Sequence, residues 1–363
     1  MKAAMFQGAN KPLLIDEVEI DKPKDHEVLV KVMACGVCHS DLHYVKGLVP
    51  MKIPTLLGHE AAGIVEEVGG LVSSVKPGDH VIALSVIYCG QCDQCISGNP
   101  SSCVNRESTR RRDNEKPRTT WHGQKVTPVS DGGAFAEKML GHENSFVKIP
   151  DEMPFDRAAL IGCAVTTGAG SVLNHAQVKP GTSVAVYGCG GIGLSAIQGA
   201  RIAGALKIIA VDTVESKLAM ARRLGATHTV DASSSDAVKK IQEITDGKGV
   251  DYAIEAVGLK KTGEQCVHSL AVRGTAVLIG MVPAGQKLEI EPGWIIGGAR
   301  YLTGCVLGSN RFRIDTPRYV EYYRQGRLNL DEMVTRHCRL EEIDEAFKLM
   351  DGGELVRSVV MFD

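Results

Sequence analysis

Residues 35–60, CGVCHSDLHYVKGLVPMKIPTLLGHE, concentrate side chains that can bind a metal ion. Cys38 offers a thiol and His59 an imidazole, while Ser40 and Asp41 add a hydroxyl and a carboxylate. Thiolate and neutral imidazole suit zinc, and a catalytic zinc takes three protein ligands with one position left open. Cys38 and His59 would be two of these ligands, so the third must lie elsewhere in the chain.

A lone cysteine, Cys163, stands in the segment AALIGCAVTTGAGSVLNHA. It follows an apolar run and precedes what we expect to be the start of a helix that crosses from one domain to the next. A free cysteine often behaves as a small core hydrophobe, so a packed thiol is one interpretation. The presence of Cys38 and His59 makes Cys163 our candidate for the third ligand.

A second group of cysteines lies in the segment YCGQCDQCISGNPSSC. Its spacing, C-x2-C-x2-C-x7-C, allows four thiolates to close a tetrahedral shell around one zinc, which leaves no position for a substrate. We expect a structural zinc that holds a lobe with too few apolar residues to fold alone. Four unrelated thiols are the alternative. The four predicted ligands are Cys89, Cys92, Cys95 and Cys103.

A glycine-rich segment, GCGGIG, follows the β-rich run TSVAVYG and precedes the helical stretch LSAIQGARIAGA. This context predicts a dinucleotide site, in which glycines let the backbone approach a pyrophosphate at a helix N-terminus. An acidic residue, Asp212, ends the next apolar run, IIAVD. It can accept hydrogen bonds from the adenine ribose and would repel a 2′-phosphate, which favours NAD over NADP. A glycine-rich turn without a cofactor is the alternative.

The elements that must position these residues follow two patterns. Apolar and polar residues alternate at 2–34, and the strand pattern continues at 63–68, 80–84 and 132–150, which predicts a mostly β region. Between 182 and 307, strands alternate with helices, which predicts a mostly parallel, doubly wound α/β sheet. Two helical stretches, 317–325 and 340–350, and a final strand, SVVMF, would rejoin the first domain. The predicted boundaries are 1–164 with 308–363 for the catalytic domain and 165–307 for the dinucleotide-binding domain.

Length and composition agree with this division. A chain of 363 residues is too long for one compact core, and 44% hydrophobic and 23% charged residues are typical of a soluble globular protein. A net charge of -2 gives no reason to expect a nucleic acid or an anionic membrane as partner. No run approaches the ~20 apolar residues of a membrane helix. Eleven cysteines without a signal peptide indicate reduced thiols and metal ligation, so we expect a cytoplasmic enzyme.

A polar segment from Val104 to Ser130 contains an arginine run at 110–112. Runs of like charge usually face water, so we predict a solvated loop here. The alternative is a site for a phosphate or carboxylate on the substrate, because arginine binds both through paired hydrogen bonds.

Taken together, these features resemble the zinc-dependent medium-chain alcohol dehydrogenases, and the match covers nearly the whole chain. The resemblance implies a mostly β, GroES-like catalytic domain with a structural zinc lobe, joined to a Rossmann domain that binds NAD. It also implies two zinc ions per chain. The catalytic ion would lie on Cys38, His59 and Cys163, since two cysteines and one histidine form the family's catalytic site.

The resemblance assigns roles to the surrounding residues. Ser40 matches the hydroxyl that touches the substrate oxygen, and His43 the outer end of a proton relay, with a surface histidine as the alternative for His43. Asp41 matches a carboxylate that orients the imidazole of His59, and Glu60 one close behind the metal. In the cofactor half, Lys217 matches a residue near the adenine ribose and Arg357 one that contacts the pyrophosphate. The full set of predicted cofactor contacts is His39, Thr167, Gly188, Gly190, Gly191, Gly193, Asp212, Lys217 and Arg357.

Two positions depart from the family pattern. Many relatives carry arginine beside the first zinc ligand, whereas this chain has His39, so that phosphate contact would be weaker and pH-dependent. Ser85 stands where an aromatic residue often lines the substrate pocket. Serine there predicts a wider pocket and weakens any claim that ethanol is the substrate.

We therefore predict reversible hydride transfer from a primary or secondary alcohol, including bulky or aromatic ones, to NAD+. One alternative is a glutathione-dependent formaldehyde dehydrogenase, which the arginines at 110–112 would serve. Others are a non-catalytic protein that binds zinc and NAD, and an enzyme that keeps its NADH bound between turnovers. The long loop before Gly132 resembles dimeric relatives, which predicts a homodimer, with a tetramer as the alternative.

Overall fold

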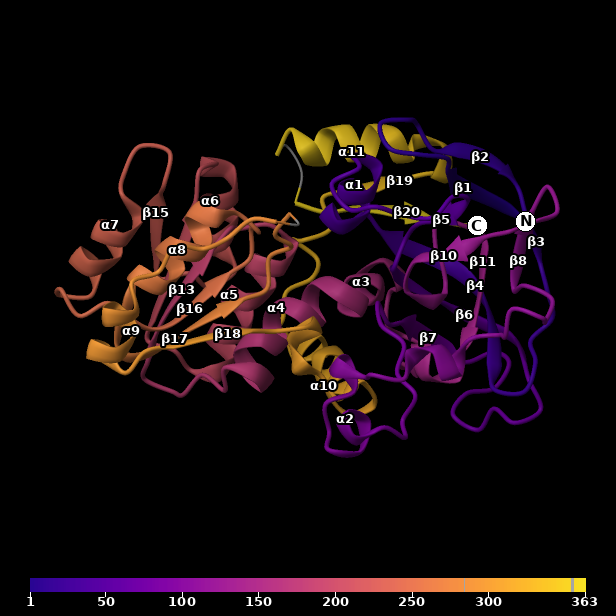
Figure 1. The fold of residues 1–363 in the computed structure, drawn as a ribbon, viewed down its shortest axis with the longest axis horizontal. Helices are drawn as coiled ribbons and strands as arrows, with labels where there is room; N and C mark the ends of the chain where they lie inside the picture. Colours follow the sequence, from indigo (N-terminus) through magenta and orange to yellow (C-terminus); the bar gives the residue numbers. More distant parts are fainter. Residues whose placement is uncertain (284, 354–355) are drawn as a thin grey trace. The chain divides into compact units, whose positions relative to one another are not determined.

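The computed structural model describes residues 1–283, 285–353 and 356–363 and divides the chain into two compact units (Figure 1). The first unit comprises Met1–Cys163, Arg311–Glu321 and Leu330–Asp363. The second comprises Ala164–Asn310 and Tyr322–Asn329. Cys163 is therefore the residue after which the chain first leaves the first unit.

Strands that are antiparallel, except where β19 pairs with β20 in parallel, form the main sheet of the first unit. The order is β12-β7-β6-β4-β20-β19, and β11 also pairs with β4. The C-terminal strand β20 pairs with β4 opposite Cys35 and its neighbours, so the end of the chain returns to the strand that leads to Cys38. These strands are β4 Glu27–Gly36, β6 Glu60–Val68, β7 His80–Ala83, β11 Lys138–His142, β12 Phe146–Lys148, β19 Arg336–Cys338 and β20 Ser358–Met361.

Smaller sheets of order β10-β5-β1-β2 and β3-β8-β9 complete the described β structure of this unit. Their strands are β1 Lys2–Phe6, β2 Leu14–Glu17, β3 Glu19–Ile20, β5 Thr55–Leu56, β8 Thr119–Trp121, β9 Gln124–Lys125 and β10 Thr127–Pro128. Its helices are α1 His39–Val45, α2 Asp93–Ile96, α3 Phe155–Leu160 and α11 Ile343–Asp351, together with the part of α10 Phe312–Arg324 that ends at Glu321. Helix α11 buries Ile343, Ala346, Phe347 and Met350, the spacing of one apolar helix face.

A parallel sheet of order β15-β14-β13-β16-β17-β18 forms the second unit, with helices packed beside it (Figure 1). This is the predicted Rossmann-like architecture, and the strand order reverses between β13 and β16, where such sheets bind ligands. The strands are β13 Ser183–Tyr187, β14 Lys207–Asp212, β15 His228–Asp231, β16 Val250–Glu255, β17 Leu270–Leu278 and β18 Tyr301–Gly304. The helices are α4 Thr166–Gly170, α5 Gly191–Ala203, α6 Glu215–Arg223, α7 Ala237–Ile244, α8 Lys260–His268 and α9 Pro292–Gly298.

Some elements differ from the predicted ones. The helix predicted at 317–325 begins earlier, at Phe312, and contains Pro317. Strand β17 contains Arg273, whose φ is +63°. No helix within the described part of the chain combines the length and the apolar character that crossing a membrane requires.

Candidate functional site

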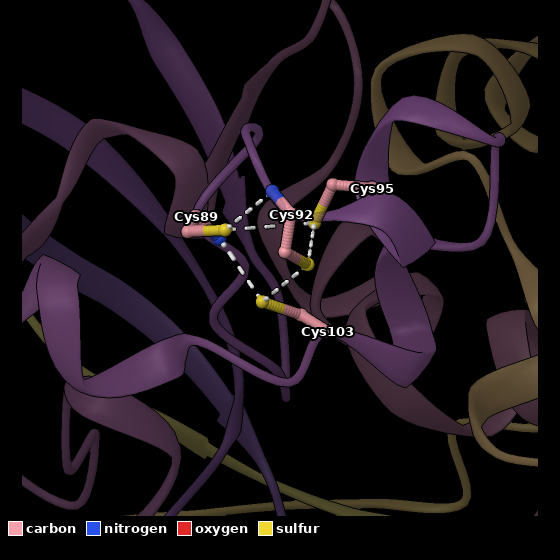
Figure 2. A group of neighbouring side chains, drawn as sticks. All are labelled: Cys89, Cys92, Cys95 and Cys103. Atoms are coloured by element: carbon pink, nitrogen blue, oxygen red, sulfur yellow. Dashed lines mark hydrogen bonds between the residues drawn. The ribbon is translucent and has the colours of Figure 1, made fainter.

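The four cysteines of the predicted structural site come together in one short lobe (Figure 2). Their sulfur atoms all lie within 4.8 Å of one another, and Cys92 Sγ is 3.5 Å from Cys95 Sγ and 3.8 Å from Cys103 Sγ. The backbone N–H groups of Gln91 and Cys92 donate to Cys89 Sγ at 3.4 and 3.3 Å. Such donors stabilise the thiolate form that binds zinc. The lobe fits a closed, four-sulfur zinc site.

Two apolar side chains of this lobe face solvent instead of a core. Ile96 in α2 is 75% exposed, and Val104, next to Cys103, is 77% exposed. Hydrogen bonds from the backbone of Val104 and Cys95 lower the pKa of Cys92 below its usual value, which favours the thiolate form that binds zinc. A segment with many ligands and few buried apolar side chains depends on its metal for stability.

The three predicted catalytic ligands come together in the first unit although they are far apart in sequence. Cys38 is the N-cap of α1, His59 directly precedes β6, and Cys163 lies in a π-helical turn, Ile161–Val165. One donor atom from each, with a carboxylate oxygen of Glu60, lies within 4.8 Å of the others, and all four residues are buried. Two sulfur atoms and one imidazole are the donor set of a catalytic zinc, so these residues fit that ion.

Two further residues of α1 contact this group. Ser40 Oγ donates to Cys38 Sγ at 3.2 Å and lies 3.0 Å from His59 Nε2. Asp41 accepts a hydrogen bond from the Gly58 N–H at 3.1 Å and lies 3.1 Å from His59 Nδ1. A carboxylate at Nδ1 orients the ring and leaves Nε2 for a metal. The first turn of α1 thus brings a ligand, a hydroxyl and an orienting carboxylate to the same place.

Glu60 lies beside the donor atoms and forms a buried ion pair with Arg357. Arg357 Nη2 is 2.6 Å from Glu60 Oε1, and Nη1 donates to the backbone carbonyl of Val37 at 2.9 Å. Burial raises the pKa of Glu60 above its usual value, and the charge of Arg357 opposes this shift and favours the carboxylate. The structure thus places Arg357 in the interior of the first unit, 3% exposed, and its contact with pyrophosphate stays a prediction.

The ionisable ligands influence one another strongly. A hydrogen bond between Cys163 and Cys38 lowers the pKa of Cys38 well below its usual value and raises that of Cys163 well above it. Burial alone would lower the pKa of His59, but the charges of Asp41 and Cys163 raise it well above its usual value. Zinc binds deprotonated thiols and neutral imidazole, so metal binding here would release protons.

Two histidines on α1 have different surroundings. His43 lies one turn after Ser40 and is half-buried, and burial lowers its pKa below the usual value while the charge of Cys38 opposes the shift. His39, at the start of the helix, is exposed. The predicted relay residue His43 is therefore partly shielded from water, whereas His39 is exposed to it.

The glycine-rich segment forms the predicted turn between β13 and α5. Gly188 has a φ of +90°, and a Cβ there would lie 2.6 Å from Val257 Cγ2. Gly193 packs so closely on the turn that a Cβ would overlap the carbonyl of Gly188. Nothing in the described residues lies within 4 Å of a Cβ built on Gly190. The backbone at Gly190 is therefore open to a pyrophosphate at the start of α5, so the turn fits a dinucleotide.

Asp212 ends β14 and faces this turn. Its Oδ2 accepts a hydrogen bond from Cys189 N at 2.7 Å, and its Oδ1 accepts from Thr213 N and Val214 N at 2.8 and 3.0 Å. The carboxylate therefore holds the glycine-rich turn to the end of the next strand. Lys217 lies on α6, the helix that follows.

Thr167, in α4, is buried, and its Oγ1 has no hydrogen-bond partner within the described ranges. A buried hydroxyl is normally paired, so this one is fit to contact a ligand.

The arginine run at 110–112 differs from the predicted solvated loop. The side chain of Arg111 is only 7% exposed, and its nitrogen atoms lie 2.5 Å from carboxylate oxygens of Glu27 and Asp21. Arg110, in contrast, forms an ion pair near the surface. The reason is that Glu27 begins the buried strand β4 and needs a partner for its charge. Arg111 therefore anchors the loop to the first unit.

Sequence reasoning missed two buried carboxylates that organise the backbone. Glu27 pairs with Arg118 as well as Arg111, and no local pattern links position 27 to either arginine. Glu255 ends β16 and accepts hydrogen bonds from Val257 N and Gly258 N, both at 2.9 Å. An acidic residue that closes an apolar run and stands three residues before a glycine was the signal for Glu255.

Two family models match the chain. The alcohol dehydrogenase GroES-like domain matches residues 24–151, and the zinc-binding dehydrogenase domain matches residues 191–321. The first model covers the lobe, Cys38 and His59, and the second begins inside the glycine-rich segment.

Solved structures of similar proteins cover the whole chain. An alcohol dehydrogenase zinc-binding domain protein from Burkholderia ambifaria is 35% identical, with a TM-score of 0.95 over 100% of this chain and 98% of that chain. Benzyl alcohol dehydrogenase from Acinetobacter calcoaceticus is 33% identical, with a TM-score of 0.94 over 100% and 99%. A protein from Sinorhizobium meliloti, described as a zinc-binding dehydrogenase bound to NADP, is 29% identical, with a TM-score of 0.84 over 99% of each chain.

Proposed function

The chain belongs to the zinc-binding alcohol dehydrogenase family, and we propose that it oxidises primary or secondary alcohols reversibly to aldehydes or ketones with NAD+. The observation that carries the proposal is the buried group of Cys38, His59 and Cys163 with the Ser40 hydroxyl among its donor atoms. A purely structural zinc site has four protein ligands and no open position for a substrate, so a hydroxyl beside the ligands would have no reaction partner there.

Each residue of the site has a task in this reaction. Cys38, His59 and Cys163 would hold zinc, which as a Lewis acid lowers the pKa of an alcohol hydroxyl. Ser40 would accept the substrate proton, because its Oγ lies 3.2 Å from Cys38 Sγ and 3.0 Å from His59 Nε2, beside two atoms that would hold the metal. His43, one turn further along α1, would pass the proton to solvent, a task that suits a group titrating near neutrality.

We further propose that NAD, rather than NADP, is the preferred cofactor. Support comes from Asp212, whose carboxylate would repel a 2′-phosphate at the end of β14. Because Asp212 also accepts backbone hydrogen bonds from the glycine-rich turn, Asp212→Asn is a gentler test than removal of the side chain. We expect this substitution to reduce the ratio of kcat/KM for NAD+ to kcat/KM for NADP+ roughly tenfold, because it removes the negative charge that would repel a 2′-phosphate. An unchanged ratio would refute the ribose role.

Aromatic and bulky alcohols are the substrate class that we propose. Ser85 supports this choice, because its small side chain bonds to the carbonyl of Gly162 and leaves free the space that an aromatic residue often fills at its position. The similarity to benzyl alcohol dehydrogenase from Acinetobacter calcoaceticus is consistent with the same class.

A glutathione-dependent activity has lost its main support. Arg111, the central arginine of the run that would bind the carboxylates of a glutathione adduct, is already bonded to Glu27 and Asp21. The loop before Gly132 still favours a homodimer in our proposal, which sedimentation would test.

The experiment that tests the proposed function combines zinc content with turnover. We expect two zinc ions per chain and NADH formation with alcohols from a panel of primary, secondary and aromatic compounds, whether or not glutathione is added. One zinc per chain with no turnover on any alcohol would favour a non-catalytic protein. Activity that appears only with glutathione would favour the formaldehyde dehydrogenase alternative.

A further inference from the structure

Ser85 contacts the segment that carries Cys163. Its backbone N–H donates to the carbonyl of Gly162 at 3.3 Å, and its Oγ donates to the same carbonyl at 3.2 Å. Ser85 is half-buried just after β7, so the hydroxyl is shielded in part from water. A side chain whose donor is used in this way is directed at the protein backbone and not at a substrate.

Gly162 is held closely against the end of β7. A Cβ at this position would overlap the carbonyl of Ala83, and Ile82 Cγ2 would be 3.6 Å away. Only glycine permits this approach without displacing the backbone. The segment before Cys163 is thus fixed by a close contact with Ala83 and by two hydrogen bonds from Ser85.

The backbone around Cys163 is irregular, which explains why it needs such support. Ile161–Val165 forms a π-helical turn between α3 and α4. Turns of this kind interrupt the regular hydrogen-bond ladder of a helix and occur often at functional sites. Cys163 is the middle residue of this turn, and the direction of its Sγ follows from how the turn is oriented.

We propose that Ser85 is a positioning residue for Cys163, which it acts on through the carbonyl of Gly162, and that its hydroxyl is not a substrate contact. The inference rests on the proposed function, because Cys163 must be a zinc ligand for its position to matter. A residue without a side-chain donor at position 85 would leave the carbonyl with one hydrogen bond fewer. Groups that orient metal ligands in this way affect metal affinity as well as activity.

Ser85→Ala in the zinc-loaded enzyme tests the proposal. We expect zinc to leave the catalytic group about tenfold faster, as seen by transfer to a chromogenic chelator. After replacement of zinc by Co2+, the thiolate-to-metal charge-transfer bands should shift relative to the parent. The kcat should fall while the KM for the alcohol changes little. Ser85→Thr keeps the hydroxyl and should restore both the release rate and the spectrum.

Two controls separate this effect from general damage. Ser269→Ala removes a serine hydroxyl that donates to a backbone carbonyl, that of Cys266, at 2.9 Å in the second unit, and should change neither readout. In a Cys163→Ala background, only the lobe should hold zinc. Adding Ser85→Ala to that background should leave the rate of zinc release from the lobe unchanged.

The outcomes are distinct. An unchanged Co2+ spectrum and release rate would overturn the proposal, and a raised KM with an unchanged spectrum would show instead that Ser85 contacts the substrate. If Ser85→Ala does not fold, Gly162→Ala tests the same contact. The added Cβ would clash with the carbonyl of Ala83 and so displace the carbonyl of residue 162 from Ser85. Faster release would then support the proposal, and parental release would overturn it. If the parent enzyme holds no zinc at Cys163, the proposed function fails first, whereas a normal parent with an unaffected Ser85→Ala rejects only this inference.

Discussion

The first unit contains two cysteine groups that differ in almost every respect except the metal they fit. The lobe takes all its sulfur atoms from residues 89–103, exposes part of them, and supports them mainly with backbone N–H groups. The other group takes its donors from positions 38, 59 and 163 and buries them all. It is supported by side chains, namely Ser40, Asp41 and the Glu60–Arg357 pair.

This difference separates two uses of a metal. A metal that stabilises a fold needs only ligands, and a short segment can supply four of them. A metal that reacts needs an open position, a proton acceptor and a controlled charge around it, and these come from side chains that the whole fold must deliver. Removing one residue from each group should therefore have opposite consequences for activity and stability.

The largest effect should follow Cys163→Ala. Loss of the third ligand should reduce alcohol-dependent NADH formation by at least about 10⁴-fold, because the metal supplies several kcal/mol of charge stabilisation. The lobe should keep its zinc, so the metal content should fall to one per chain, and NADH binding measured by fluorescence should persist. A variant that retains two zinc ions and turns over normally would disprove the ligand assignment.

The opposite result should follow Cys103→Ser in the lobe. We expect loss of the structural zinc and a fall in the thermal midpoint of roughly 10 °C, since such a lobe owes several kcal/mol to its metal. Activity at low temperature should stay within a few-fold of the parent, because the buried ligands are untouched. An unchanged midpoint measured by calorimetry would mean that the lobe folds without its metal.

A smaller loss of stability should follow Arg111→Ala in the loop after the lobe. The change leaves Glu27 and Asp21 short of a partner, and breaking a buried ion pair costs about 3–5 kcal/mol. Arg118 still pairs with Glu27, so we expect the lower end of this range in urea unfolding. Arg110→Ala is the matched control, because an exposed pair contributes only about 0–1 kcal/mol. Equal effects of the two changes would show that Arg111 is not an anchor.

The two cysteine groups also differ in how well they could be predicted from the sequence. The lobe and the glycine-rich turn could be identified because each is a local pattern, and their geometry follows from neighbouring residues. Cys163 could be proposed only because Cys38 and His59 required a third ligand. Helix α7 was missed although Asp236 accepts hydrogen bonds from Val238 N and Lys239 N as its N-cap, because the helix is short.

Contacts between residues that are distant in the sequence could not be predicted from it, and the reason is physical. Arg111 with Glu27, Arg357 with Glu60, and Ser85 with Gly162 each join residues that periodicity and spacing do not relate. Burial decides these pairs, since a buried charge or carbonyl must find a partner. The prediction of a solvated arginine run was wrong for Arg111 because the rule for charged runs describes residues on the surface, and this side chain lies inside.

The smallest effect that we predict concerns His43, which distinguishes the reactive group from a closed one. His43 must be neutral to accept a proton, so its contribution to turnover is present above its pKa and lost as the pH falls through it. Burial lowers that pKa below 6.5, so the parent should keep its rate somewhat below pH 6.5 before the rate declines. A bound cation would offset the negative charge of Cys38, which is the influence that raises the pKa, and the shift would remain downward.

His43→Gln should therefore abolish this acid limb in a profile of kcat against pH and reduce kcat about 10- to 100-fold. Added imidazole buffer should restore part of the rate, because it replaces the missing proton acceptor. His39→Gln is the matched control on the same helix, since we expect that residue to affect NAD+ affinity and leave the acid limb in place. An acid limb that survives in His43→Gln would assign the proton relay to a different group.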